Sequence, residues 1–347
     1  MAESRASGNG ASDDIARKSV DLVFEGGGVK GIALVGAYAV LEERGYEPQN
    51  MAGASAGAIV AALIAAGYKA GELKEIVANL DYDRFKDEAL EDRLPMGKTL
   101  SVLKDLGIYE GSAFEEWMRD RLQAKGKRTF GDLVRREDVE PRYRYKLQII
   151  ASDVTERRLL VLPRDAPKLG IDDPDDIDVA RAVRMSMSIP IFFEPVRFAN
   201  PKTGREHLIV DGGMLSNFPV WLFDAKEPQW PTIGMRMVRK PRSPIGEELP
   251  EPAPRGRVTE VVNYLRSLVD TMMAAHDRFY VEQNDFDERT IGIDPLGVGT
   301  TEFDLSSERA LRLYDSGRSA AKKFLDHLPQ DSAAPARREA ASPAAPG

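Results

Sequence analysis

The residue best placed to do chemistry in this sequence is a serine in a glycine-flanked turn. Ser55 is the centre of Gly53-Ala54-Ser55-Ala56-Gly57, a G-x-S-x-G pattern, between an apolar segment and an Ala-rich one. A nucleophile elbow has this strand–turn–helix setting and needs small residues two positions before and after the serine. The pattern therefore predicts an exposed nucleophilic hydroxyl at a helix N-terminus, although a serine there also fits a plain helix N-cap.

A run of glycines forms the second candidate element. Residues 25–31 read EGGGVKG, between a predicted strand and a predicted helix. Such a run leaves backbone N–H groups uncovered at a helix N-terminus, which favours negative charge. Gly26, Gly28 and Gly31 also match the dinucleotide-binding pattern, but that pattern needs an acidic residue near the end of the next strand, where residues 51–54 read MAGA. We interpret the run as an anion cradle, with dinucleotide binding and a purely structural turn as alternatives.

A serine hydroxyl needs a base, and the three histidines are poor candidates for it. His207 and Asp211 lie four residues apart in one predicted strand, about 13 Å at ~3.3 Å per residue, so only one of them can reach Ser55. His276 lies within a predicted amphipathic helix, and His327 ends the last predicted helix. The base therefore has to be sought among other residue types.

Asp211 is the alternative base. It ends the apolar strand HLIVD and is followed by Gly212 and Gly213. In open α/β sheets, ligands bind at the carboxyl ends of strands, where the glycine run, Ser55 and Asp211 would all lie. An Asp-Gly turn that only links two elements fits the same residues.

With these three features in place, the chain resembles the patatin-like phospholipases. EGGGVKG is similar to the family's G-G-G-x-[KR]-G oxyanion motif, GASAG to its nucleophile motif and DGG to its D-G-[GA] motif, in the same order. The likeness runs from about Ser19 to His327 and includes ASDVTERRLLVL, ARAVRMSMSIPIFFEPV and TTEFDLS. Residues 81–111 show no alignable similarity by inspection.

The resemblance implies a three-layer α/β/α fold with a mostly parallel central sheet and a Ser-Asp dyad that needs no cofactor and no metal. It implies a lipid acyl hydrolase of the phospholipase A or lysophospholipase type, which cleaves carboxylic esters through an acyl-Ser55 intermediate with Asp211 as general base. An acyltransferase with the same nucleophile and a non-enzymatic dinucleotide-binding or regulatory module are the rival readings. The predicted oxyanion residues are Gly26, Gly27, Gly28 and Val29, and the residues that support the motifs are Lys30, Gly31, Gly53, Gly57, Gly212 and Gly213.

An aspartate is a weaker base than a histidine by about 2.6 pKa units, or ~3.5 kcal/mol. The site would have to compensate by desolvating Asp211 and by strong oxyanion stabilisation. Lys30 fits either a charge that assists the headgroup or a surface lysine that caps its helix. Ile189, Ile191, Phe192 and Phe193 fit either an acyl pocket or the core, and residues 94–109 fit a lid or a lipid-facing patch.

Composition narrows the partners. The net charge of -8 argues against nucleic acid as a ligand, and the absence of cysteine excludes disulfides, thiol catalysis and Cys-ligated metals. The expected partner is a phospholipid or another acyl lipid, with a local apolar contact to a membrane as a hypothesis. Neither a signal peptide nor a membrane span is expected, so we expect a cytoplasmic or peripheral membrane protein, and a protein exported without a cleaved signal would look the same.

Alternating strand and helix patterns predict one α/β domain over residues 19–328, between disordered segments at 1–18 and 329–347. Ser112 and Glu115 predict a capping box. The strands are expected at 20–24, 51–53, 147–151, 158–162, 207–210 and 232–238, and the helices at 32–44, 56–66, 70–80, 112–124, 177–187, 259–283 and 307–327.

Overall fold

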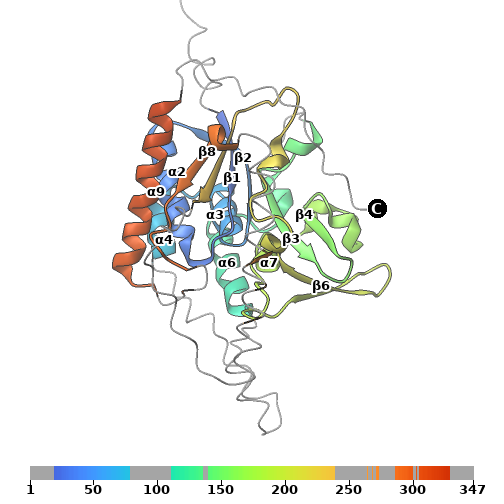
Figure 1. Ribbon diagram of the computed structural model, residues 1–347. Helices are drawn as coiled ribbons and strands as arrows, with labels where there is room; N and C mark the ends of the chain where they lie inside the picture. The colour runs from blue at the N-terminus through green and yellow to red at the C-terminus, as the bar shows by residue number, and fades with distance from the viewer. Residues whose placement is uncertain are drawn as a thin grey trace, which may run out of the picture.

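The computed structural model describes residues 19–78, 111–135, 140–238, 286–299 and 305–328, with single residues at 264, 268, 271, 272 and 302. The two predicted disordered ends, the predicted helix at 259–283 and the predicted lid at 94–109 lie outside these ranges, apart from the four single residues between 264 and 272. Within the described ranges, a mixed, mostly parallel sheet packs against helices (Figure 1). This confirms the predicted α/β class.

Five strands form the parallel part of the sheet, in the order β3-β2-β1-β7-β8. Three further strands pair antiparallel: β4 and β6 with β3, and β5 with β6. The strands are β1 (Ser19–Phe24), β2 (Glu47–Ala54), β3 (Leu147–Asp153), β4 (Arg158–Leu162), β5 (Val196–Ala199), β6 (Glu206–Asp211), β7 (Thr232–Met237) and β8 (Thr290–Ile293).

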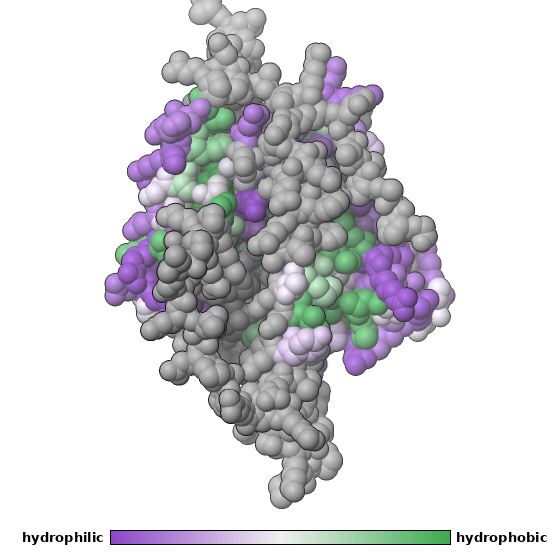
Figure 2. Space-filling view, viewed as in Figure 1, coloured by the Kyte–Doolittle hydropathy of each residue, from purple (hydrophilic) through white to green (hydrophobic). Residues whose placement is uncertain are grey.

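The helices lie where the sequence pattern predicts them, to within a few residues. They are α2 (Gly31–Glu43), α3 (Ala56–Ala65), α4 (Ala70–Ala78), α6 (Ser112–Ala124), α7 (Val179–Ser186) and α9 (Ser307–His327). Helices α2 and α9 cross so closely that a methyl group at Gly36 would lie 2.0 Å from the Tyr314 carbonyl oxygen, and one at Gly317 would lie 1.9 Å from that of Ala33. The outward side of α9 is mainly hydrophilic (Figure 2).

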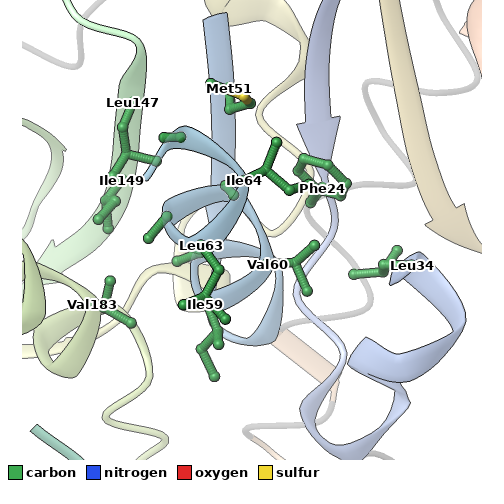
Figure 3. Packing of buried hydrophobic residues seen from close by; sticks show 14 of the residues in the cluster. Phe24, Leu34, Met51, Ile59, Val60, Leu63, Ile64, Leu147, Ile149 and Val183 are labelled. Atoms are coloured by element: carbon green, nitrogen blue, oxygen red, sulfur yellow. The ribbon is translucent and has the colours of Figure 1, made fainter. Parts of the chain in front are cut away.

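Helix α3 positions the candidate nucleophile, because Ser55 immediately precedes it. All ten of its residues are buried, as expected for a helix that is apolar on every side. Figure 3 shows the reason: Val60 points toward Leu34 of α2, and Leu63 toward Ile149 of β3. Ser55 therefore stands on a helix that is held from all sides by the core.

The predicted capping box at the start of α6 is wrong. The N-cap is Gly111, in a left-handed conformation with φ 73°, and no side chain caps the helix. Glu115 instead forms ion pairs with Arg119 at 2.7 Å and with Arg181 at 2.8 Å. Glu115 binds the arginines because their hydrogen bonds to its carboxylate are charge-assisted. Ser112 cannot act as the N-cap because it is already the first residue of the helix.

Candidate active site

Ser55 and Asp211 come together where the carboxyl ends of strands β2 and β6 meet. Along β3, Ile150 pairs with Ala54 of β2, and the next residue, Ala151, pairs with Asp211 of β6. Strand β4 pairs with both of these β3 residues and so occupies the other edge of β3. Because a strand has only two edges, β2 and β6 share one edge and meet end to end. Asp211 ends β6 and Ser55 directly follows β2, so the two residues face each other across this junction.

The backbone at Ser55 has the strained geometry of a nucleophile elbow. Ser55 has φ 51° and ψ -126°, in a region that non-glycine residues rarely adopt. A methyl group at Gly53 would lie 2.4 Å from the Gly57 carbonyl oxygen, and one at Gly57 would lie 2.3 Å from that of Phe24. The two outer glycines of the motif are therefore needed for strand, turn and helix to approach this closely.

Asp211 is fully buried, with 0% of its surface exposed. Its Oδ1 atom accepts a hydrogen bond from the Gly213 amide at 2.7 Å. Desolvation raises the pKa of Asp211 from its ordinary value of 3.8 to about 7, against the lowering effect of hydrogen bonds from the Ser55 hydroxyl and the Gly213 amide. This carboxyl is therefore poised to exchange a proton near neutral pH.

The contact between Ser55 and Asp211 is loose in this structure. The Ser55 hydroxyl is close enough for its hydrogen bond to lower the pKa of Asp211. Oδ2 of Asp211 is nevertheless buried without a partner in good hydrogen-bond geometry among the described residues. Catalytic hydrogen bonds are often long or poorly aligned before substrate binds, so this geometry fits a nucleophile and its base at rest.

The glycine turn packs directly beside Ser55. A methyl group at Gly26 would lie 3.1 Å from Cβ of Ser55 and 2.1 Å from Oδ1 of Asn217. The Gly26 amide donates to the Asn217 carbonyl at 2.9 Å, so it is not available as an oxyanion donor. The prediction that Gly26 is an oxyanion residue therefore has to be corrected. Gly26 packs next to Ser55, but its N–H group is not free to bind an oxyanion.

The next three amides in the turn are different. Within the described residues, the N–H groups of Gly27, Gly28 and Val29 donate to no acceptor. Gly28 has φ 56°, a conformation that glycine adopts readily. Lys30 is only 5% exposed and its side chain lies over the turn, since a methyl group at Gly27 would be 3.6 Å from Cε of Lys30. The reading of Lys30 as a surface residue is wrong.

The end of α7 contacts the backbone of both Ser55 and Asp211, and no sequence pattern indicates these contacts. Oγ of Ser186 accepts the Ser55 N–H at 2.9 Å, and the Ser188 carbonyl accepts the Asp211 N–H at 3.0 Å. Arg184, 3% exposed, donates to Oγ of Ser188. In the sequence these residues only continue an amphipathic helix, because their partners lie far away along the chain.

The two histidines that the structure describes bind residues other than Ser55 and Asp211. His207 is buried, and its Nδ1 lies 2.9 Å from Oδ2 of Asp153, which also pairs with Arg158 at 3.2 Å. His327 is exposed at the end of α9, where Nδ1 lies 2.7 Å from the Lys323 carbonyl oxygen. His276 lies outside the described residues.

The family follows from a comparison with known proteins. The model of the patatin-like phospholipase family matches residues 22–224, more than half of the 347 residues. The chain belongs to this family. The match includes the glycine turn, Ser55 and Asp211, and membership of the patatin-like phospholipases implies lipid acyl hydrolase activity.

The chain is also similar to individual proteins. YqhO, an uncharacterized protein of Bacillus subtilis (strain 168), is 39% identical over 307 residues, which cover 88% of this chain and 98% of YqhO. The uncharacterized NTE family protein Rv2565 of Mycobacterium tuberculosis (strain ATCC 25618 / H37Rv) is 28% identical over 272 residues, which cover 76% of this chain and 39% of Rv2565. The crystal structure of VipD from Legionella pneumophila matches with a TM-score of 0.52 at 19% identity, over 89% of this chain and 66% of that chain, and shows the shared fold.

The four apolar residues of the loop after α7 differ in burial. Ile189 and Phe193 are buried in the core, whereas Ile191 and Phe192 are partly exposed. Ile191 has φ 76°, an unfavourable conformation for a β-branched residue. The core reading therefore holds for Ile189 and Phe193, and an acyl-facing position of Ile191 and Phe192 stays a prediction.

Other sites in the described residues are few. A cavity of about 390 Å³ beside α6 and α7 is lined largely by charged side chains, and neither Ser55 nor Asp211 belongs to its lining. Among the residues that the structure describes, no group of three or more His, Asp or Glu could hold a metal ion. No described helix combines the length and apolar character needed to cross a bilayer.

Proposed function

We propose that this chain is a serine-dependent lipid acyl hydrolase with Ser55 as nucleophile and Asp211 as general base. The observation that carries this proposal is the meeting of β2 and β6 on one edge of β3, which sets the Ser55 hydroxyl against a desolvated carboxyl. The glycine turn packs beside Ser55 at Gly26, and its amides at Gly27, Gly28 and Val29 have no acceptor among the described residues.

In the acylation step, the Asp211 carboxylate takes the proton of the Ser55 hydroxyl while Oγ attacks the ester carbonyl carbon. The carbonyl oxygen becomes an oxyanion and accepts hydrogen bonds from the amides of Gly27, Gly28 and Val29. When the tetrahedral intermediate collapses, the C–O bond to the alcohol breaks and protonated Asp211 gives its proton to the leaving alkoxide. The products are acyl-Ser55 and an alcohol or lysolipid.

Deacylation repeats the same chemistry with water. The Asp211 carboxylate removes a proton from water, and the resulting hydroxide attacks the acyl carbon of acyl-Ser55. The same amides stabilise the second oxyanion. The fatty acid leaves as Ser55 regains its proton from Asp211, and the site returns to its starting state without a metal or a cofactor in any step.

The raised pKa supports Asp211 as the base at neutral pH. A general base works best when its pKa lies near the working pH, and a value of about 7 meets that condition, whereas an ordinary aspartate at 3.8 does not. Oxyanion donors supply the remaining stabilisation, since loss of a single donor in another serine hydrolase costs roughly 2.7–4 kcal/mol.

Acyl lipids are the proposed substrate class because of the family and because of the loop next to the dyad. The Ser188 carbonyl binds the Asp211 amide, and the partly exposed Ile191 and Phe192 follow within four residues. An acyl chain that enters beside Ser55 would therefore meet an apolar wall.

Release of fatty acid tests this proposal. Wild type is incubated with phosphatidylcholine and with lysophosphatidylcholine, in parallel with the variants Ser55→Ala and Asp211→Asn. We expect fatty acid from wild type and less than ~1% of that rate from either variant. Full turnover by Asp211→Asn would contradict the assigned base. Acyl transfer to added glycerol in preference to water would favour the acyltransferase alternative.

A further inference from the structure

We propose that Ser186 is a positioning residue of the dyad, and that the last turn of α7 fixes the separation of Ser55 and Asp211. The inference rests on the proposed function, because it concerns the same nucleophile and base. It assigns a role to a side chain that would not touch the substrate.

The first part of the evidence is the acceptor of the Ser55 amide. The residue Ser186 is completely buried, at 0% exposure, and its Oγ accepts the Ser55 N–H at 2.9 Å. The strained φ of 51° at Ser55 needs such an external contact, because local backbone preference does not favour this conformation. Without Oγ of Ser186, a buried N–H would lose its partner at the residue that must attack.

The second part is the acceptor of the Asp211 amide. The Ser188 carbonyl, two residues beyond Ser186, accepts this N–H at 3.0 Å. Arg184, two residues before Ser186, donates to Oγ of Ser188, and Nε of Arg184 donates to the Gly111 carbonyl at 3.1 Å. Oγ of Ser188 in turn donates to the Arg184 carbonyl at 2.7 Å. Hydrogen bonds at Arg184 and at Ser188 therefore hold both ends of the segment that contains Ser186.

The consequence for the reaction is geometric. A single short segment binds the backbone of the nucleophile through a side chain and the backbone of the base through a main-chain carbonyl. A misplacement of about 1 Å can reduce a reaction rate 10²-fold. Since the Ser55 N–H is engaged by Ser186, the nucleophile's own amide is not available to the oxyanion.

The decisive experiment compares Ser186→Ala and Ser186→Cys with a matched control, Ser316→Ala. Ser316 lies on α9, and its hydroxyl likewise makes a hydrogen bond to a distant backbone group, here as the donor to the Asp294 carbonyl at 2.8 Å. Ser186→Cys keeps nearly the same volume but offers only a weak acceptor, so it separates the lost hydrogen bond from an empty space. Thermal unfolding gives the folded fraction of each variant, and every rate is expressed per folded molecule.

Two rates are measured: labelling by a fluorophosphonate and turnover of a soluble short-chain ester. We expect both Ser186 variants to lose roughly 10–100-fold in labelling rate and in kcat with KM changed less than about threefold, and Ser316→Ala to match wild type. Unchanged kcat in Ser186→Cys and Ser186→Ala would overturn the role of Ser186. A loss that appears only in KM would overturn it as well. A wild type that reacts with neither reagent would instead contradict the proposed function itself.

Discussion

Replacing Asp211 with asparagine should stabilise the folded protein at neutral and alkaline pH while it abolishes activity. Asparagine keeps the shape of the side chain and an acceptor for the Gly213 amide, but it carries no charge to desolvate. Burial raises the pKa of Asp211 from 3.8 to about 7, a difference of about 3 units. At 1.36 kcal/mol per unit, holding this carboxylate ionised in the folded state costs about 4 kcal/mol.

The sign of the pH dependence follows from proton binding. Between pH 3.8 and about 7 the folded state of wild type holds a proton that the unfolded state has lost. The contribution of Asp211 to stability is therefore fully present below pH 3.8, falls as the pH rises, and is lost above about pH 7. Between pH 5 and pH 8 the wild type should lose about 3 kcal/mol relative to Asp211→Asn, from about 2 pH units at 1.36 kcal/mol each.

Urea unfolding of both proteins at pH 5 and pH 8 measures this difference, because changes common to both proteins cancel. In parallel, kcat/KM of wild type on a short-chain ester should rise with pH with a midpoint near 7, as Asp211 loses its proton. A stability difference that is the same at both pH values would refute the reasoning, because the carboxyl would then have an ordinary pKa and would not be a desolvated base.

Four further variants test other parts of the site. Gly26→Ala should reduce kcat by more than ~10-fold, because a methyl group at Gly26 would lie 2.1 Å from Oδ1 of Asn217. The kcat of Gly27→Ala should stay within about threefold of wild type, because a methyl group at Gly27 meets nothing closer than 3.6 Å. Equal rates for the two variants would contradict this packing. Asn217→Ala removes the hydrogen bond from Nδ2 to the Gly26 carbonyl, 3.1 Å, and should lower the fluorophosphonate labelling rate with little effect on KM. His207→Asn should lower the melting temperature but leave kcat per folded molecule unchanged, and a large loss of kcat would reopen the case for a histidine base.

The local motifs could be recognised from the sequence because their residue types follow from short-range geometry. Gly53 and Gly57 are required where strand, turn and helix touch, and the glycine turn requires residues that expose amides and tolerate positive φ. The apolar character of α3 on all sides likewise predicted its burial. These features depend on neighbours within a few residues, so a sequence pattern carries them.

The remaining features depend on contacts between distant segments. Nothing in the sequence indicates that β2 and β6 meet on one edge of β3, since this arrangement depends on pairings between distant residues, Ala54 with Ile150 and Ala151 with Asp211. For the same reason Ser186 and Arg184 look like ordinary helix residues, although they contact Ser55 and Ser188. The hydrogen bond from the Gly26 amide to the Asn217 carbonyl could not be predicted either, because that acceptor lies in another loop.

The most direct test of the account is to locate a fluorophosphonate adduct by mass spectrometry. Wild type, Ser55→Ala and Asp211→Asn are treated at pH 8, digested, and the modified peptide is sequenced. We expect one adduct on Ser55 in wild type, no adduct in Ser55→Ala, and strongly slowed labelling in Asp211→Asn. An adduct on any other residue, or one that persists in Ser55→Ala, would contradict the claim that Ser55 is the nucleophile and Asp211 its base.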